Sequence, residues 1–190
     1  GFYKGLFSDD VAQMTKEGKI GSFLHVLTTE EANLLQELAF QSRLKIPILI
    51  GIDAIHGNAL VSGTTVYPSP ISLASTWSDA FLYDVGKQSA KEMRATGSHW
   101  AFTPNIDVLR DPRWGRVGET FGEDPFMVGN MGAAMINGFQ QGDFSGTEKV
   151  IACAKHMIAG GEPVNGLNAA PMDVSLRTLK EVHLKPYKKA

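Results

Sequence analysis

Short apolar runs alternate with longer amphipathic stretches along this chain, and the pattern repeats four times. The run "IPILIGID" at 46–53 is almost continuously apolar, which is typical of a strand buried on both faces. The stretch 28–44 begins with Thr28, carries acids in its first turn and spaces its apolar residues three and four apart, which predicts a helix. The predicted strands are 19–27, 46–53, 100–109 and 150–160, and the predicted helices are 28–44, 78–97, 122–142 and 173–189. This alternation indicates one α/β domain with a parallel sheet.

Polar side chains mark the carboxyl end of every predicted strand after the first. They are Asp53 with His56, Asp107 with Arg110, and Lys155 with His156. An open doubly wound sheet would usually carry a G-x-G-x-x-G or P-loop string after a strand, and none is found. A closed (β/α)8 barrel of the TIM type instead gathers its strand ends at one mouth, where barrel enzymes keep their chemistry. We therefore predict the barrel, of which four strand–helix units are only the N-terminal half to two-thirds.

The composition narrows the classes of partner. Of the 190 residues 43% are hydrophobic, which is enough for one sizeable core. Lys and Arg number 18 against 20 Asp and Glu, a net charge of -2, so the chain lacks the excess positive charge that holds a nucleic acid. No nucleic-acid partner is predicted. No apolar run reaches the length of a membrane span, so no membrane partner is predicted. The single cysteine, Cys153, excludes an internal disulfide and is predicted to be a small buried hydrophobe.

The string "RDPRWGR" at 110–116 places three arginines and a tryptophan at the end of a predicted strand. Guanidinium groups can hold vicinal hydroxyls or carboxylates bidentately, and an indole offers a flat face for an apolar surface. This combination suits a neutral polyol. The acids that follow, Glu119, Glu123 and Asp124, are equally good partners for internal ion pairs, so for each arginine both interpretations stay open.

Two other kinds of site, a Schiff-base lysine and a zinc site, fit the strand-end residues less well than sugar binding does. Lys155 at a barrel strand end is compatible with a Schiff-base enzyme of the aldolase type, although the neighbouring His156 and arginines favour a charged ammonium. Asp53, His56 and His156 do not form a ligand set with the usual spacing for zinc. We predict no metal and no cofactor.

Four strings resemble those of one known family. They are "GIDAIHG" at 51–57, "YPSPISLASTW" at 67–77, "NIDVLRDPRWGRVGETFGEDP" at 105–125 and "AKHMIAGG" at 154–161. In this order and spacing they resemble the N-terminal barrel domain of glycoside hydrolase family 3, particularly its β-glucosidase branch. The resemblance implies that 1–190 belongs to the barrel domain of a retaining, exo-acting β-glucosidase, which removes terminal β-D-glucosyl residues from oligosaccharides or aryl glucosides.

The resemblance also implies roles for single residues. Asp53 matches the carboxylate that accepts hydrogen bonds from the outer hydroxyls of the terminal sugar, and Arg116 matches a guanidinium that binds the same sugar. Lys155 and His156 match an adjoining pair of donors, at a turn where the family has non-proline cis peptide bonds. We predict these four residues to bind substrate, whereas His56 is predicted to be structural.

The bond-breaking residues are not identifiable in this segment. A retaining glycosidase needs a nucleophile and an acid/base, and the resemblance implies that both lie beyond Ala190, on a later strand of the barrel and in a following α/β domain. Asp79 follows a serine but opens a predicted helix, so we interpret it as a helix-start residue. The chain is therefore predicted to be truncated before the nucleophile strand, to need the remainder of the barrel and the second domain as partners, and to be inactive alone.

Some positions depart from the family's pattern. Met157 stands where an aromatic residue is common, and the loop "GGEPVNGLNAAPMDVS" at 160–175 differs from the family's usual loop, so Glu162, Asn165 and Asn168 are candidates for tuning specificity. A β-xylosidase of the same family and a non-catalytic sugar-binding module remain alternatives. A periplasmic or secreted location fits the resemblance, but the residues do not indicate a compartment. His25, His99 and His183 are expected to serve ordinary packing or to lie on a helix surface.

Overall fold

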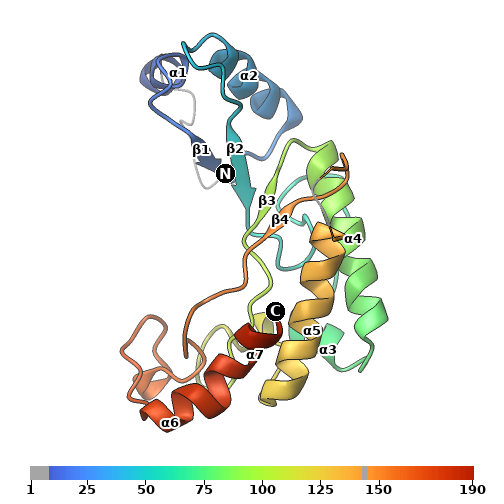
Figure 1. Ribbon diagram of the computed structural model, residues 1–190, viewed down its shortest axis with the longest axis vertical. Coiled ribbons are helices and arrows are strands. Elements are labelled where there is room, and N and C mark those ends of the chain that lie inside the picture. The colour runs from blue at the N-terminus through green and yellow to red at the C-terminus, as the bar shows by residue number, and fades with distance from the viewer. Residues whose placement is uncertain (1–8, 143–144) are drawn as a thin grey trace.

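In the part of the chain that the structure describes, four short parallel strands form one sheet whose order follows the chain, β1-β2-β3-β4 (Figure 1). The strands are Ser22–Leu24, Leu49–Ile52, Trp100–Ala101 and Ile151–Ala152. Phe23 pairs with Ile50, Gly51 with Trp100, and Ala101 with Ala152. The computed structural model describes residues 9–142 and 145–190. Since the order never reverses, the sheet is that of a TIM-barrel-type α/β fold rather than a doubly wound one, which confirms the predicted class.

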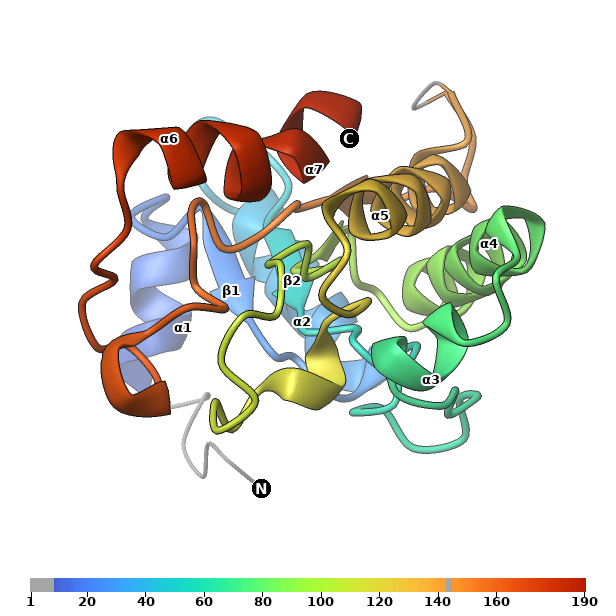
Figure 2. The same cartoon turned by 90° about the horizontal axis from the view of Figure 1, so that it is seen from below.

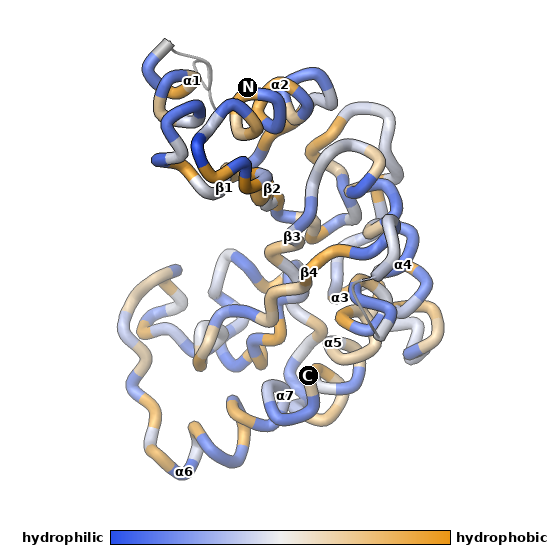
Figure 3. Tube along the Cα trace, turned by 45° about the horizontal axis from the view of Figure 1, so that its top comes forward, coloured by the Kyte–Doolittle hydropathy of each residue, from blue (hydrophilic) through white to orange (hydrophobic). Residues whose placement is uncertain are grey.

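Helices follow each strand, as the pattern predicted. The α-helices are α1 (Asp9–Lys16), α2 (Thr29–Phe40), α3 (Pro70–Ala74), α4 (Asp79–Ala95), α5 (Pro125–Gln140), α6 (Leu176–Thr178) and α7 (Leu184–Lys189), with a π-helical segment at Leu179–His183 and 3₁₀ turns at Val117–Glu119 and Val164–Gly166. Helices α4 and α5 lie side by side, and α1 and α2 lie at the opposite end of the sheet (Figures 1 and 2). Strands β2 and β4 run through hydrophobic segments of the chain (Figure 3).

The predicted helix starts are confirmed by their caps. The side chains of Thr28, Ser78 and Asp124 each accept a hydrogen bond from a backbone N–H in the first turn of α2, α4 and α5. Asp79 lies in that first turn of α4, as predicted. Helices α1 and α3 were not predicted, and α3 begins at Pro70. Proline is favourable at a helix start because its missing N–H has no partner there.

The strands are shorter than predicted. The prediction 100–109 ends in the structure after Ala101, although Asn105 still forms a bridge with Lys155. Pro104 has no N–H to donate to a ladder, so the sheet cannot continue regularly through it. The segment beyond each strand is irregular, and this is where the polar side chains lie.

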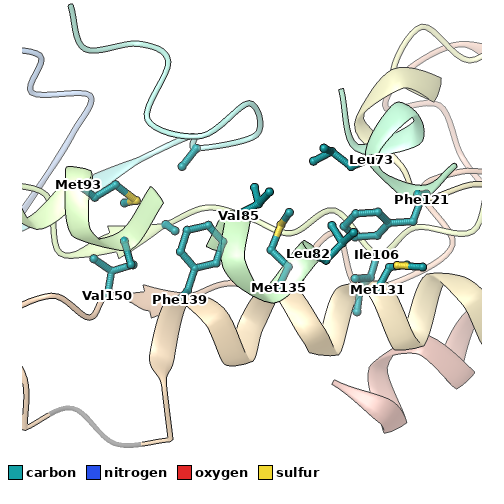
Figure 4. Packing of buried hydrophobic residues seen from close by; sticks show 14 of the residues in the cluster. Leu73, Leu82, Val85, Met93, Ile106, Phe121, Met131, Met135, Phe139 and Val150 are labelled. Atoms are coloured by element: carbon teal, nitrogen blue, oxygen red, sulfur yellow. The ribbon is translucent and has the colours of Figure 1, made fainter. Parts of the chain in front are cut away.

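The largest core cluster joins the sheet to α4 and α5. Leu82 and Val85 of α4 meet Met131, Met135 and Phe139 of α5 in a close layer of buried side chains (Figure 4). The two helices approach closely through two glycines that face the partner helix, Gly86 of α4 and Gly138 of α5. This packing joins α5 to α4 and to the edge strand β4.

We expect Gly138→Ala to lower the free energy of unfolding by about 2 kcal/mol. The added Cβ would overlap the backbone oxygen of Tyr83 across the α4–α5 contact, and this overlap outweighs the gain of about 1 kcal/mol in helix propensity. Urea unfolding followed by circular dichroism measures the effect. The control is Gly21→Ala, because no atom lies within 4 Å of the added Cβ. Equal stability of both variants would contradict the close contact.

Candidate functional site

The carboxyl ends of three strands meet around one carboxylate, Asp53. Lys155, which follows β4, donates from Nζ to Asp53 Oδ1 at 2.8 Å, although the two residues are 102 positions apart. His25, which follows β1, places Nε2 at 3.1 Å from Asp53 Oδ2. The Asp53 side chain is still 35% exposed, so a ligand can reach its oxygens. Asp53 and Lys155, which follow different strands, thus lie in direct contact at the strand ends.

Asp53 is held as a carboxylate. Burial by itself would raise its pKa, but the hydrogen bond and charge of Lys155, with a smaller effect of His25, outweigh burial and lower the pKa below its ordinary value. An ionised carboxylate has only acceptor sites, which suits the donation of two sugar hydroxyls. The Nζ of Lys155 is engaged by this carboxylate at 2.8 Å, whereas a Schiff base requires a free amine. The contact therefore argues against the aldolase alternative.

The lowered pKa of Asp53 predicts a pH dependence of stability. The folded protein favours the ionised form of Asp53, so this group stabilises the fold at pH values above the ordinary pKa of a carboxyl group. The stabilisation is lost as the pH falls from that ordinary pKa to the lower pKa of Asp53 in the folded protein. We expect the unfolding free energy of the wild type to decline more steeply between about pH 5 and pH 3 than that of Asp53→Asn. Urea titrations at each pH measure this, and identical slopes for the two proteins would contradict it.

A second carboxylate, Asp107, holds the turn that carries His156. Asp107 is 1% exposed. Its Oδ2 accepts from the backbone N–H of His156 at 3.2 Å and lies 2.9 Å from His156 Nδ1, while Oδ1 accepts from Gly160 N at 3.1 Å. A Cβ at Gly160 would come within 2.9 Å of Asp107 Oδ1, so glycine permits this approach. Because Nδ1 of His156 is engaged by Asp107, its Nε2 is the ring nitrogen that can meet a ligand.

All three arginines of the "RDPRWGR" string have acidic neighbours. Arg113 pairs with Asp111, and Arg110 lies 3.9 Å from Glu162. Arg116 donates from Nε and Nη2 to the two oxygens of Glu119 at 3.0 and 2.6 Å. The predicted acidic partner is therefore right for Arg116, which pairs with Glu119. Asp124, another predicted partner, instead caps α5.

Arg116 also interacts electrostatically with the two strand-end carboxylates. Its pKa is raised chiefly by the hydrogen bond to Glu119, and further by the charges of Asp107 and Asp53, which therefore lie within electrostatic reach. The guanidinium carbon lies 5.9 Å from the centre of the Trp114 ring, a cation–π distance. Glu119 and Trp114 thus hold Arg116 in one orientation beside the site, while the side chain keeps about a quarter of its surface exposed.

A cavity of about 490 Å³ lies next to Arg116 and His156. It is lined by Trp114, Arg116, His156, Met157, Ile158, Gly160, Pro163, Asn168, Ala169, Ala170, Pro171 and Met172. Arg116 and His156 therefore lie on its wall, whereas Asp53 and Lys155 lie outside it. The four predicted binding residues form two adjoining groups, Asp53 with Lys155 and Arg116 with His156, and the second group opens into this cavity.

Several other predicted positions can be placed. His56 is structural as expected, with Nδ1 at 3.2 Å from the carbonyl oxygen of Tyr67. The peptide bonds Lys155–His156 and Met157–Ile158 are cis, at the turn where the resemblance implied such bonds. The prediction that Cys153 is buried is wrong, because its side chain is partly accessible in an irregular segment after β4.

The histidines were only partly predicted. His99 does serve packing, with Nδ1 accepting from Ile50 N at 3.3 Å. The same expectation is wrong for His25, which contacts Asp53, and incomplete for His183, which is buried and bonds Glu162 at 2.9 Å. His25 could have been found, because it follows the first strand just as Asp53 follows the second. The contact of His183 has no comparable signal in the sequence.

The described part of the chain offers neither a metal-binding cluster nor a membrane-crossing helix. Within 9–142 and 145–190, no group of three or more His, Cys, Asp or Glu side chains is arranged to hold a metal ion. In the same residues no helix combines the length and the apolar character that a membrane crossing requires.

Comparison with known proteins places this geometry in a family. The Glycosyl hydrolase family 3 N terminal domain matches residues 4–190. The chain belongs to glycosyl hydrolase family 3. This family 3 chain is 39% identical over 181 residues to a β-xylosidase of Formosa agariphila and 32% identical over 179 residues to a periplasmic β-glucosidase of Salmonella typhimurium. These alignments cover 90% and 94% of the chain, but only 25% and 23% of the relatives.

Solved structures agree with the assignment. A β-glucosidase involved in saponin metabolism from intestinal bacteria superposes with a TM-score of 0.88 at 35% sequence identity, over 95% of this chain and 24% of that one. The family 3 chain thus spans about a quarter of the length of the proteins that it matches. Membership confirms the resemblance drawn from the four strings. The substrate-binding roles of Asp53, Arg116, Lys155 and His156 stay predictions, as does the location of the nucleophile and the acid/base beyond Ala190.

Proposed function

We propose that residues 1–190 supply the sugar-binding clamp of a retaining, exo-acting β-glucosidase that hydrolyses terminal non-reducing β-D-glucosyl residues. The clamp is defined as Asp53, Arg116, Lys155 and His156. The observation that carries the proposal is the contact of Asp53 with Lys155 at 2.8 Å at the strand ends, with His156 next in the chain and Arg116 lining the same cavity as His156. An ionised acceptor beside three donors is complementary to the hydroxyls of one pyranose ring.

The chemistry assigned to these residues is recognition. Asp53 accepts from vicinal hydroxyls, and Lys155, Arg116 and His156 Nε2 donate to ring substituents, which holds the sugar while its ring distorts toward the transition state. Asp53 is engaged with Lys155 and His25, and Asp107 is fully enclosed, so neither is assigned as nucleophile or acid/base. In this proposal those two catalytic carboxylates lie beyond Ala190, in the rest of the barrel and in a second α/β domain.

A β-xylosidase is the second candidate. The 39% identity to the Formosa agariphila β-xylosidase favours it, and xylose presents the same ring hydroxyls to the clamp as glucose does. The two sugars differ at C5, where glucose carries a hydroxymethyl group. The clamp contacts proposed here do not depend on that group.

The test is hydrolysis by the full-length protein that contains this chain. We expect the protein to release 4-nitrophenol from 4-nitrophenyl β-D-glucoside. The first sugar product seen in NMR spectra should be the β-anomer of glucose. The chain of 190 residues alone should bind sugar without turnover. A faster reaction with the β-xyloside would favour the second candidate. Sugar binding without hydrolysis of either glycoside by the full-length protein would instead indicate a non-catalytic module.

A further inference from the structure

A second cavity lies at the amino ends of the strands, whereas Asp53 and Lys155 follow their carboxyl ends. Its volume is about 370 Å³. Its wall includes His99, which directly precedes β3, and Ile151, which begins β4. Arg94, in the last turn of α4, joins them. Because the strands are parallel, their amino ends gather these side chains at one place.

The polar side chains of this wall present hydrogen-bond donors. Nδ1 of His99 accepts from Ile50 N at 3.3 Å, so in the neutral ring the proton lies on Nε2. Arg94 donates from Nε to Thr147 O at 3.2 Å, which holds the guanidinium while its two Nη groups keep their donors. Among the described residues that line the cavity, none is Asp or Glu. The wall therefore offers donors without an acidic side chain to receive them.

Arg94 and His99 lie close enough to repel each other when both are charged. The pKa of His99 is lowered chiefly by burial and further by the positive charge of Arg94. An anion bound between the two groups would relieve this repulsion and favour the protonated ring, which then donates from Nε2 with a full charge. Lys149 lines the same cavity and places a third nitrogen donor in its wall. This electrostatic arrangement is complementary to a negatively charged ligand.

The rest of the wall includes apolar side chains. They belong to Pro47, Ile48, Leu49 and Ile151. Ile151 is 39% exposed, so part of its surface is open to a ligand. The volume is within the range of small-molecule sites and exceeds what a single small ion needs. The cavity therefore has room for a small organic group attached to the anion.

We propose that this cavity binds a phosphate group, either as the free ion or as the monoester of a small organic molecule. The guanidinium of Arg94 presents paired N–H donors that match two oxygens of one phosphate, and Nε2 of His99 donates to a third. The site goes beyond the proposed function, because it uses none of the clamp residues and does not depend on hydrolysis.

The test is isothermal titration calorimetry of the full-length protein with inorganic phosphate at low ionic strength. We expect Arg94→Gln to weaken phosphate binding by about tenfold, because a charged hydrogen-bond donor is lost. His99→Asn should weaken it to a similar extent, since asparagine keeps an acceptor for Ile50 N but removes Nε2. Circular dichroism checks that both variants are folded. Phenyl phosphate distinguishes the two sources of the group: tighter binding of the ester indicates an organic monoester, and tighter binding of the inorganic ion indicates free phosphate.

The matched control is Arg43→Gln. Arg43 is exposed and does not line the cavity, so this variant loses the same charge without a change in the site, and phosphate affinity should stay unchanged. Phosphate binding that is absent in the wild type, unchanged in Arg94→Gln, or weakened equally in Arg43→Gln would overturn the site. None of these results bears on hydrolysis of the β-glucoside, so the proposed function stands or fails separately.

Discussion

Replacing Asp53 by asparagine is expected to lower kcat/KM of the full-length protein for an aryl β-glucoside by about a thousandfold. The change removes the charged acceptor for sugar hydroxyls and leaves the Lys155 ammonium without its partner at 2.8 Å. Both effects weaken contacts that tighten in the transition state, so kcat should fall as well as affinity. Steady-state kinetics with 4-nitrophenyl β-D-glucoside measures the loss.

A matched control separates this effect from a general loss of charge. Asp84 is an exposed carboxylate on α4, and Asp84→Asn should leave kcat/KM within about twofold of the wild type. Circular dichroism checks that both variants are folded. Near wild-type activity in the folded Asp53→Asn protein would remove Asp53 from the clamp.

Asp107→Asn is expected to lower kcat/KM by about a hundredfold and the free energy of unfolding by about 1–3 kcal/mol. The two oxygens of Asp107 accept from His156 and Gly160, and an amide would turn one of these acceptors into a donor. One buried backbone N–H would then face another donor, and the turn would no longer hold the His156 ring. The measurements are steady-state kinetics and urea unfolding.

A double-mutant cycle with His156→Ala tests how Asp107 acts. Asp107 touches no predicted ligand atom and works through His156, so it is a positioning residue. If this is so, the double variant should lose far less activity than the product of the two single losses. Losses that multiply would show that Asp107 supports activity through some other contact.

The arrangement of strands and helices could be predicted because it depends on local signals. The caps Thr28, Ser78 and Asp124 lie where each helix begins, and the continuous apolar run before Asp53 is the buried strand β2. Strand length depends instead on which backbone groups find partners across the sheet. That is why the prediction 100–109 overran β3, which ends at Ala101, three residues before Pro104.

The part of the site at the strand ends could be predicted from the sequence, whereas the part that depends on loop geometry could not. Strand ends of a barrel converge, which anticipated the meeting of Asp53 and Lys155 and should have included His25. The bond between Trp114 and Asn168 spans 54 positions and depends on the path of a loop rich in glycine, asparagine and proline. No periodicity of side chains encodes such a path, so the cavity could not be derived from the sequence.

The most direct test of the clamp is a crystal structure of the full-length protein with glucose bound. We expect one glucose ring at the strand ends, with its hydroxyls within hydrogen-bonding distance of Asp53, Lys155, His156 and Arg116 together. A glucose molecule bound elsewhere, or one that contacts Arg116 and His156 but neither Asp53 nor Lys155, would contradict the account.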